Sequence, residues 1–241
     1  RGMICLGVTT DTLDAVGQVL EEKPVDVTEE QVEAVLEKFR GDIKQVPPMY
    51  SAKKIDGKKL YELARQGVEV EREAKDVHID ELKLISFDGT NIEVDVTCTS
   101  GTYIRVLALD IGEALGCGGH LSALRRTRVG NFDLSSAITI DDLADAPQKA
   151  EELTLSMGDA LTALPTVEIP ADIGAMIKNG YQLTVADLRT LDLPDFKLDD
   201  ALMLRTLQGD LIGIARSLYT SEELGSVRRE KQALKTERVL A

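Results

Sequence analysis

Apolar and polar side chains alternate along residues 78–87 and 91–98, with Ile92, Val94, Val96 and Cys98 on one face of the second stretch. A period of two residues predicts half-buried β-strands. The Asp88-Gly89 pair between them is typical of a hairpin turn. A strand is also predicted for residues 3–8, so the first half of the chain is expected to contain a mainly antiparallel sheet.

The second of these strands leads into an apolar stripe with helical spacing. After a Ser100-Gly101 break, a helix is predicted by apolar residues three or four positions apart, namely Ile104, Leu107, Ala108, Ile111 and Leu115. The glycine-rich residues 116–119 then reverse the chain. Residues 121–128 are expected to form another strand, with Leu124, Arg126 and Arg128 on one side and Ala123, Arg125 and Thr127 on the other.

Local signals predict the remaining helices. Thr28 and Gln31 form a capping box for a helix that Gly41 closes. Residues 50–55 are expected to form a short strand, and Asp56-Gly57 a tight turn into a helix over residues 58–66. Thr139 and Asp142 cap a short helix over 139–146, and after a polar link at 147–152 another helix is predicted over 153–164.

The pattern changes at Pro165 to short strands and turns: strands at 166–169, 201–207 and 211–215, a turn at Asn179-Gly180, and a basic end from 228 to 238. The predicted fold class is therefore α+β, with a mixed, mainly antiparallel sheet and flanking helices, followed by a small β-rich domain. The expected domain limits are residues 1–164 and 165–241.

Composition narrows the class of protein. The 241 residues are 43% hydrophobic and 29% charged, which is typical of a soluble globular protein, and no apolar run approaches the roughly 20 residues of a membrane span. Three cysteines without C-x-x-C spacing and two histidines offer no metal-ligand cluster, so no metal is expected. This cysteine usage predicts a reducing, cytoplasmic location.

The net charge of −14 argues against a nucleic-acid partner until its distribution is considered. Residues 40–75 hold nine basic and six acidic side chains, and residues 100–130 hold four and two, so both segments are net positive. An acidic body with two basic segments suits a protein that binds RNA at one defined site. An ordinary acidic enzyme with uneven charge is the alternative.

Candidate chemistry lies in the same two segments. Tyr103 and Arg105 stand at the start of the predicted helix, where a half-buried tyrosine and a surface ion pair are the ordinary readings. Arg125, Arg126 and Arg128 are harder to dismiss, because strand alternation would send them to both faces, and phosphate or carboxylate is their expected partner. In the first segment five cations surround the predicted turn with Tyr50 and Tyr61 among them, a pattern on which looped RNA can stack: Lys53, Lys54, Lys58, Lys59 and Arg65.

Two nearby carboxylates, Asp11 and Asp14, invite an acid–base interpretation. Asx turns produce this composition more often, and we therefore expect a structural role for both.

Three ordered motifs resemble the bacterial tRNA pseudouridine-55 synthases, the TruB-type family. They are Pro47-Pro-Met-Tyr-Ser-Ala-Lys-Lys-Ile-Asp-Gly-Lys-Lys-Leu-Tyr61 with Ala64-Arg65, Cys98-Thr-Ser-Gly-Thr-Tyr-Ile-Arg105, and His120-Leu-Ser-Ala-Leu-Arg-Arg-Thr127. The segment from Leu6-Gly7 to Gly17 is also similar. The resemblance covers residues 1–145, and the last domain more weakly resembles an RNA-binding domain of the PUA kind.

The resemblance implies an RNA-modifying isomerase that converts uridine 55 in the T-loop of tRNA to pseudouridine. The base would leave the loop's stack, lose its N1–C1′ bond, turn and rejoin through C5. The implied partner is the T-arm of tRNA, and the implied enzyme needs neither metal nor organic cofactor. We also expect no membrane partner and a monomer.

The resemblance also assigns roles to residues. Tyr103 would stack on the flipped uracil, and Arg105 would pair with the catalytic aspartate. Leu124 would form an apolar wall of the base pocket. The expected tRNA-backbone contacts are Arg125 and Arg126 with Lys53, Lys54, Lys58 and Lys59.

One departure from the family is serious. The nucleophilic aspartate of the family lies in a Gly-His-x-Gly-x-Leu-Asp-Pro motif, which is absent from this sequence. We therefore expect a chain that lacks the N-terminal segment with the catalytic aspartate and is inactive alone. A non-catalytic tRNA-binding module that retains the uracil pocket is the second hypothesis, and an acidic adaptor whose motifs serve only packing is the third.

Overall fold

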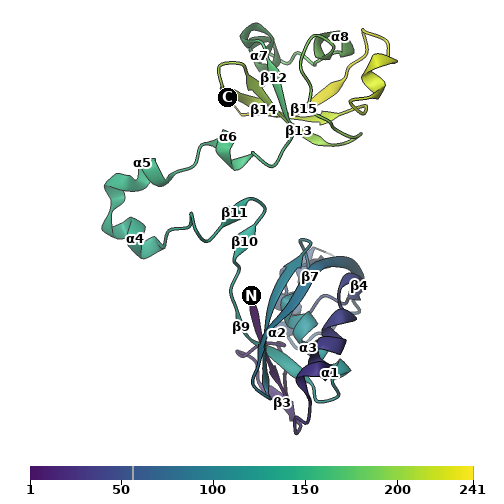
Figure 1. The fold of residues 1–241 in the computed structure, drawn as a ribbon, viewed down its shortest axis with the longest axis vertical. Coiled ribbons are helices and arrows are strands. Elements are labelled where there is room, and N and C mark those ends of the chain that lie inside the picture. The colour runs from purple at the N-terminus through teal and green to yellow at the C-terminus, as the bar shows by residue number, and fades with distance from the viewer. Residues whose placement is uncertain (56, 241) are drawn as a thin grey trace. The chain divides into compact units, whose positions relative to one another are not determined.

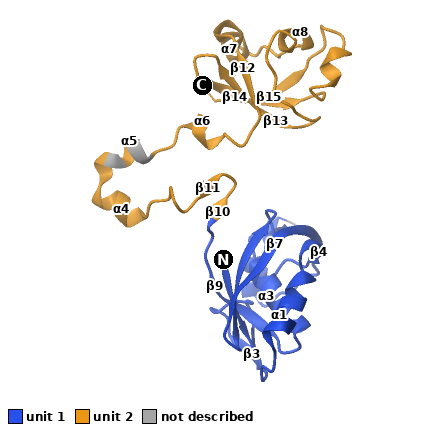
Figure 2. Ribbon diagram, viewed as in Figure 1, with its two compact units in different colours: residues 1–127 blue, residues 128–241 orange. Residues whose placement is uncertain are grey.

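The computed structural model of the chain describes residues 1–55 and 57–240. They fall into two compact units, residues 1–127 and residues 128–241 (Figure 2). Each unit is described by itself below.

The first unit is built on a five-stranded antiparallel sheet in the order β4-β7-β8-β1-β9 (Figure 1). Its strands are β1 (Gly2–Leu6), β4 (Gly41–Gln45), β7 (Lys75–Phe87), β8 (Asn91–Cys98) and β9 (Gly119–Leu124). The predicted hairpin is confirmed, since β7 pairs with β8 and Gly89 has a positive φ of 101°. The α+β class with a mainly antiparallel sheet is confirmed as well.

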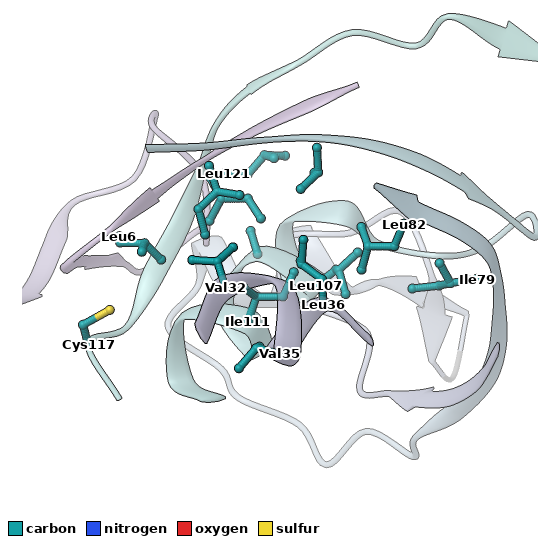
Figure 3. Packing of buried hydrophobic residues seen from close by; sticks show 14 residues of the cluster. Leu6, Val32, Val35, Leu36, Ile79, Leu82, Leu107, Ile111, Cys117 and Leu121 are labelled. Carbon is teal, nitrogen blue, oxygen red and sulfur yellow. The ribbon is translucent and has the colours of Figure 1, made fainter. Parts of the chain in front are cut away.

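Two helices, α1 (Glu29–Glu37) and α3 (Ile104–Ala114), pack against this sheet (Figure 3). The predicted capping box starts α1: the Thr28 N–H donates to Gln31 Oε1 and the Gln31 N–H donates to Thr28 Oγ1. In α3 the predicted apolar stripe faces the core, where Leu107 and Ile111 are fully buried. Burying each such side chain stabilises the unit by about 1.5–3 kcal/mol.

Helix α1 ends earlier than its closing glycine suggested. Its last residue is Glu37, and Gly41, with φ of 83°, instead begins β4.

Two small hairpins lie beside the sheet. The first pairs β2 (Val8–Thr10) with β3 (Val19–Glu22), and the second pairs β5 (Lys54–Ile55) with β6 (Lys58–Lys59). The predicted strand over 50–55 is thus wrong except for its last two residues. The predicted helix over 58–66 is shortened to α2 (Leu60–Arg65), because Lys58 and Lys59 pair across the hairpin. Of the predicted Asp56-Gly57 turn, Asp56 lies outside the described residues.

The glycine-rich turn after α3 allows a very close approach. A Cβ on Gly112 would collide with the backbone of Gly118 and Gly119, and Gly118 has φ of 73°. The strand that follows is β9, which pairs with β1 only as far as Leu124 opposite Gly2. The prediction that this strand continues to residue 128 is wrong, so strand alternation does not orient Arg125 and Arg126.

The first part of the second unit consists of short elements: β10 (Arg128–Val129), β11 (Phe132–Asp133), α4 (Ile140–Asp145), the 3-10 helix η1 (Pro147–Lys149), α5 (Ala150–Leu153) and α6 (Met157–Ala160). The predicted Thr139–Asp142 capping box of α4 is confirmed. The predicted helix over 153–164 is mostly wrong. Only α6 forms there, since the Ser156 side chain accepts from the Asp159 N–H and starts a new helix.

The rest of the second unit holds its core. A four-stranded sheet runs in the order β12 (Thr166–Ile169), β13 (Ala201–Thr206), β14 (Leu211–Ser217) and β15 (Leu234–Val239), with β12 parallel to β13 and the other pairs antiparallel. The strand positions agree with the sequence pattern. The helices α7 (Ala171–Lys178) and α8 (Val185–Leu188) and the 3-10 helix η2 (Glu223–Gly225) were not predicted. The buried core spans residues 167–234, while the domain boundary at 164/165 stays a prediction.

Among the described residues, every helix is too short or too polar to cross a membrane. The same part of the chain contains no group of three His, Cys, Asp or Glu side chains placed to bind a metal ion. Cys5, Cys98 and Cys117 are free thiols.

Candidate functional site

The predicted site is organised around the first turn of α3. Gly101 turns the chain with φ of 88°, and Tyr103 is the N-cap residue, with extended backbone angles and no capping by its own side chain. The Tyr103 N–H donates instead to Oε1 of Gln45, at 3.0 Å. Gln45 is the last residue of β4 and is only 2% exposed. A buried amide from the sheet therefore supplies the acceptor at the start of this helix.

Arg105 lies two residues further on and bridges two distant segments. Its Nη1 donates to Asp14 Oδ2 at 3.1 Å, and its Nη2 donates to the backbone carbonyl of Tyr50. The side chains of Arg105 and Asp14 are only 22% and 28% exposed, so this is a partly buried ion pair. We call Asp14, Tyr50 and Arg105 the arginine cluster.

Asp14 is held from several directions. Its Oδ1 accepts from the Thr12 hydroxyl at 2.6 Å and from the Val16 N–H at 3.2 Å, while Oδ2 faces Arg105. Burial opposes ionisation of this carboxyl, but the hydrogen bonds from Thr12 and Val16 and the Arg105 guanidinium outweigh burial and lower its pKa. Asp14 is therefore charged at neutral pH and fixed in orientation.

The structural role expected for both aspartates is correct for Asp11, whose Oδ1 accepts from the Gln18 N–H at 2.8 Å. For Asp14 that expectation was incomplete. It makes the local turn contacts and also the ion pair with Arg105, 91 residues away.

Leu124 lies at the end of β9, opposite Gly2, and is 55% exposed. A Cβ on Gly2 would lie 3.6 Å from Ile104 Cγ2 and 3.8 Å from Leu124 Cδ1, so the first residue of α3 and Leu124 flank the same glycine. Leu124 thus forms an exposed apolar surface close to the start of α3. Arg125 follows it in the chain and is anchored only through its backbone, which bonds to Arg1. The Arg125 and Arg126 side chains are exposed.

A cavity of about 120 Å³ opens beside Tyr103. Its lining includes Tyr103, Gln45 and two cationic residues, Lys53 and Lys75, together with Pro47, Val77 and Gly101. The structure therefore brings Lys53 to the same cavity as Tyr103. Lys54 does not line this cavity and instead pairs with Lys59 across the small hairpin.

The lysine hairpin, which we define as Lys53, Lys54, Lys58 and Lys59, is far less constrained. Lys59 Nζ donates to the Tyr61 hydroxyl at 3.1 Å and lies 5.3 Å from the ring centroid, and the Arg65 guanidinium lies 5.5 Å from the same ring. The expected interleaving of aromatic and cationic groups is thus present at Tyr61. At Tyr50 it is the backbone carbonyl that makes the described contact, to Arg105.

Comparison with known families explains why these residues converge. A family model described as "TruB family pseudouridylate synthase (N terminal domain)" matches residues 1–104, and a "tRNA pseudouridylate synthase B C-terminal domain" model matches residues 105–164. Together they cover more than half of the chain. The chain belongs to the TruB family of pseudouridylate synthases.

Curated relatives agree with membership of the TruB family. A "tRNA pseudouridine synthase B" of Azoarcus sp. (strain BH72) is 53% identical over 74% of this chain and 60% of its own length. One of Chromobacterium violaceum is 52% identical over 70% of this chain and 56% of its own length. The chain thus spans somewhat more than half the length of these relatives.

Solved structures extend the likeness to the fold of the TruB family. A chain of the "Crystal Structure of a Cbf5-Nop10-Gar1 Complex" aligns with a TM-score of 0.75 and 26% identity, over 99% of this chain and 64% of that one. A second, titled "Structure of H/ACA RNP bound to a substrate RNA containing 2'-deoxyuridine", aligns with a TM-score of 0.72 over 100% of this chain and 64% of that one, and at 23% identity it supports the fold alone.

Sequence reasoning in the TruB family motifs located Tyr103, Arg105 and Leu124, which the structure places around the start of α3. It missed the Arg105–Asp14 pair, the Tyr50 carbonyl and Gln45. A tertiary contact between residues 58 or 91 positions apart leaves no periodic signal in a single sequence.

Proposed function

We propose that this chain supplies the uracil pocket and much of the tRNA-binding surface of a tRNA pseudouridine-55 synthase. The proposal rests above all on one observation: Arg105 is held by Asp14 and the Tyr50 carbonyl, two residues from Tyr103, inside the segment that matches the TruB family. In this proposal uridine 55 of the T-loop flips out, and its uracil stacks on Tyr103 with Leu124 as the apolar wall. Catalytic roles are proposed for Tyr103 and Arg105.

The reaction is an isomerisation, so no atoms are gained or lost. The N1–C1′ bond breaks, the uracil turns, C5 bonds to C1′, and the proton on C5 is replaced by one on N1. A guanidinium fixed beside this site would hold a catalytic carboxylate ionised and oriented. We propose that the nucleophilic aspartate is not among residues 1–241, because the Gly-His-x-Gly-x-Leu-Asp-Pro motif does not occur in them.

Asp14 does not take the place of that aspartate in our proposal. Both of its carboxylate oxygens are engaged, one by Thr12 and the Val16 N–H and the other by Arg105. A carboxylate with both oxygens engaged is suited to orienting Arg105 and is a poor nucleophile. We therefore propose that Asp14 positions the guanidinium from one side and leaves its other N–H groups for the catalytic site.

The proposed partner is the T-arm of tRNA. The exposed cations of the lysine hairpin and Arg125 and Arg126 would contact phosphates, and Tyr61 offers a ring for stacking. In the second unit, residues 165–241 are proposed to form a PUA-like RNA-binding domain. We further propose a cytoplasmic protein that acts as a monomer and uses no cofactor.

Binding can be tested on the chain itself. We expect residues 1–241 to bind a T-arm RNA hairpin more tightly than the same hairpin with an abasic site at position 55. The difference reports the stacked uracil, for which about 1–3 kcal/mol is typical. Equal affinities for the two hairpins would contradict the uracil pocket, and the lack of any binding would favour an adaptor whose motifs serve packing.

Catalysis is tested by release of tritium from tRNA that carries uridine tritiated at C5. We expect none from residues 1–241 alone, and release when polypeptide carrying the Gly-His-x-Gly-x-Leu-Asp-Pro motif is joined to them. Turnover by residues 1–241 alone would contradict our placement of the nucleophile. Absence of turnover in both preparations would favour the second hypothesis, a non-catalytic tRNA-binding module, which the missing motif also suits.

A further inference from the structure

Gln45 is an unusual residue for the interior of this protein. Glutamine is mostly exposed in folded proteins, yet Gln45 is 2% exposed and lies at the last position of β4, opposite Lys75 of β7. A buried primary amide is tolerated only when its polar atoms have partners. The partners identify what this side chain does.

Both ends of the Gln45 amide bond to the backbone of the same residue. The Tyr103 N–H donates to Gln45 Oε1 at 3.0 Å, and Gln45 Nε2 donates to the Tyr103 carbonyl at 3.3 Å. A flipped amide would place its NH₂ against the Tyr103 N–H, so the pairing also fixes which way the amide points. The side chain thus pairs with the Tyr103 backbone groups much as one strand pairs with another.

The location of this pair at the start of α3 gives it leverage. The Tyr103 N–H precedes the helix and has no acceptor within it, while the Tyr103 carbonyl also accepts from the N–H groups of Val106 and Leu107. Gln45 therefore joins the sheet edge to the residue that begins the helix. It also lines the same 120 Å³ cavity as Tyr103. The side chain direction of Tyr103 follows from its backbone, and Gln45 holds that backbone.

We propose that Gln45 is a positioning residue that fixes Tyr103, so that the tyrosine ring is presented to the uracil without rearrangement when RNA binds. The inference rests on the proposed role of Tyr103. Gln45 itself touches no reacting atom, and its effect on the reaction passes through Tyr103 alone. Preorganisation of this kind reduces the ordering that must accompany substrate binding.

The experiment uses protein in which tyrosine carries ¹⁵N in the backbone and ¹³C in the ring. Only five tyrosines are present, and Tyr103→Phe assigns the signals of Tyr103. The backbone signal reports the bond to Gln45. The ring signal, followed while T-arm RNA is added, reports where the ring stands relative to the base.

Two variants separate positioning from stability. Gln45→Met keeps the length of the side chain and removes both hydrogen bonds. Gln45→Glu keeps the acceptor but faces the Tyr103 carbonyl with a carboxylate oxygen when ionised, and with a donating hydroxyl when protonated. We expect exchange of the Tyr103 N–H to accelerate at least 10-fold in Gln45→Met, and its ring signal to shift and to lose at least half of the RNA-induced change. Affinity for T-arm RNA should change less than threefold.

Gln45→Glu should give wild-type Tyr103 signals at pH 5 and displaced signals at pH 8, because protonation restores the donor. Gln31→Met is the matched control: it removes the capping box of α1, far along the chain from Tyr103, and should leave both Tyr103 signals unchanged. If Gln45→Met accelerates exchange but leaves the ring signal and its RNA response unchanged, or if Gln45→Glu shows no pH dependence, the positioning role is wrong. If the wild-type ring does not respond to RNA at all, the proposed function of Tyr103 fails, while the free-protein signals still decide the role of Gln45.

Discussion

The arginine cluster and the lysine hairpin lie in the same unit but are constructed in opposite ways. In the arginine cluster, the charges of Arg105 and Asp14 are partly buried and directed by hydrogen bonds from fixed backbone and hydroxyl groups. In the lysine hairpin, Lys54 and Lys58 are exposed and the β5–β6 pairing is only two residues long. The first arrangement is suited to orienting a reacting group, and the second to adding positive charge that adapts to a flexible backbone.

This contrast predicts different consequences of mutation. A change in the arginine cluster should act on the rate and on the local structure, and leave most of the tRNA affinity in place. A change in the lysine hairpin should act on affinity and its salt dependence, and leave stability in place. The following predictions test that division, with rates measured by tritium release from the preparation that carries the nucleophile motif.

Arg105→Ala should have the largest effect. It removes the guanidinium that contacts Asp14 and the Tyr50 carbonyl, and loss of one preorganised electrostatic group typically costs about 10²–10³-fold in rate. Affinity for the T-arm hairpin should fall less than threefold. The matched control is Arg105→Lys, which keeps the charge but cannot bridge both acceptors and should also be strongly impaired. A loss of affinity as large as the loss of rate would remove the distinction between the two regions.

Neutralising the lysine hairpin should have the next largest effect. Replacement of Lys53, Lys54, Lys58 and Lys59 by Gln should weaken tRNA binding by at least 10-fold at low salt and reduce the slope of log affinity against log salt by about 3, since each phosphate contact contributes about 0.7–0.9. Stability should change by less than about 0.5 kcal/mol, because exposed side chains are replaced. Lys23, Lys38 and Lys83 changed to Gln provide a control in the same unit. An equal loss in that control would mean that net charge, not the hairpin, determines affinity.

Asp14→Asn should have a smaller effect, because the amide oxygen can still accept from the Thr12 hydroxyl and the Val16 N–H. The ion pair with Arg105 is lost, so we expect a rate reduced by about 10-fold and stability reduced by about 1 kcal/mol. The pKa of Asp14 is lowered in the folded state, so its contribution to stability is present above its unfolded pKa and disappears as pH falls through the folded value. The wild-type advantage over Asp14→Asn in urea unfolding should therefore vanish at pH 2–3. A difference that persists there would show that shape, not charge, matters at this position.

The same contrast explains what the sequence could predict. The capping boxes at Thr28 and Thr139, the β7–β8 hairpin and the stripe of α3 were predictable because their partners lie within a few residues. The end of β9 and the partners of Arg105 were not, since they depend on segments that meet only in the folded chain. Family motifs supplied Tyr103 and Leu124, whereas Gln45 stood in the sequence as an ordinary polar residue. Local chemistry therefore predicted the elements, and the geometry of the site required the tertiary structure.

The last prediction concerns a carboxyl that differs from Asp14 in the same unit. Asp110 lies on α3, and burial, with a smaller contribution from the nearby charge of Glu113, raises its pKa to about 6. Within the described residues, Asp110 makes no ion pair and its side chain makes no hydrogen bond. A carboxyl whose pKa is raised on folding destabilises the folded state above its unfolded pKa, and this cost is complete above the folded pKa.

Asp110→Asn should therefore stabilise the protein by about 1 kcal/mol at pH 8, which is a third of the value implied by the full shift, since the group is only partly buried and solvent screens it. At pH 4 the difference should be close to zero, because the wild-type carboxyl is then mostly protonated in the fold. Unfolding in urea at both pH values measures it, and the exposed Asp141→Asn serves as the control with no expected difference. If Asp110→Asn were destabilising at pH 8, the charge of Asp110 would have a partner, and α3 would be held by charge at its middle as well as at its start.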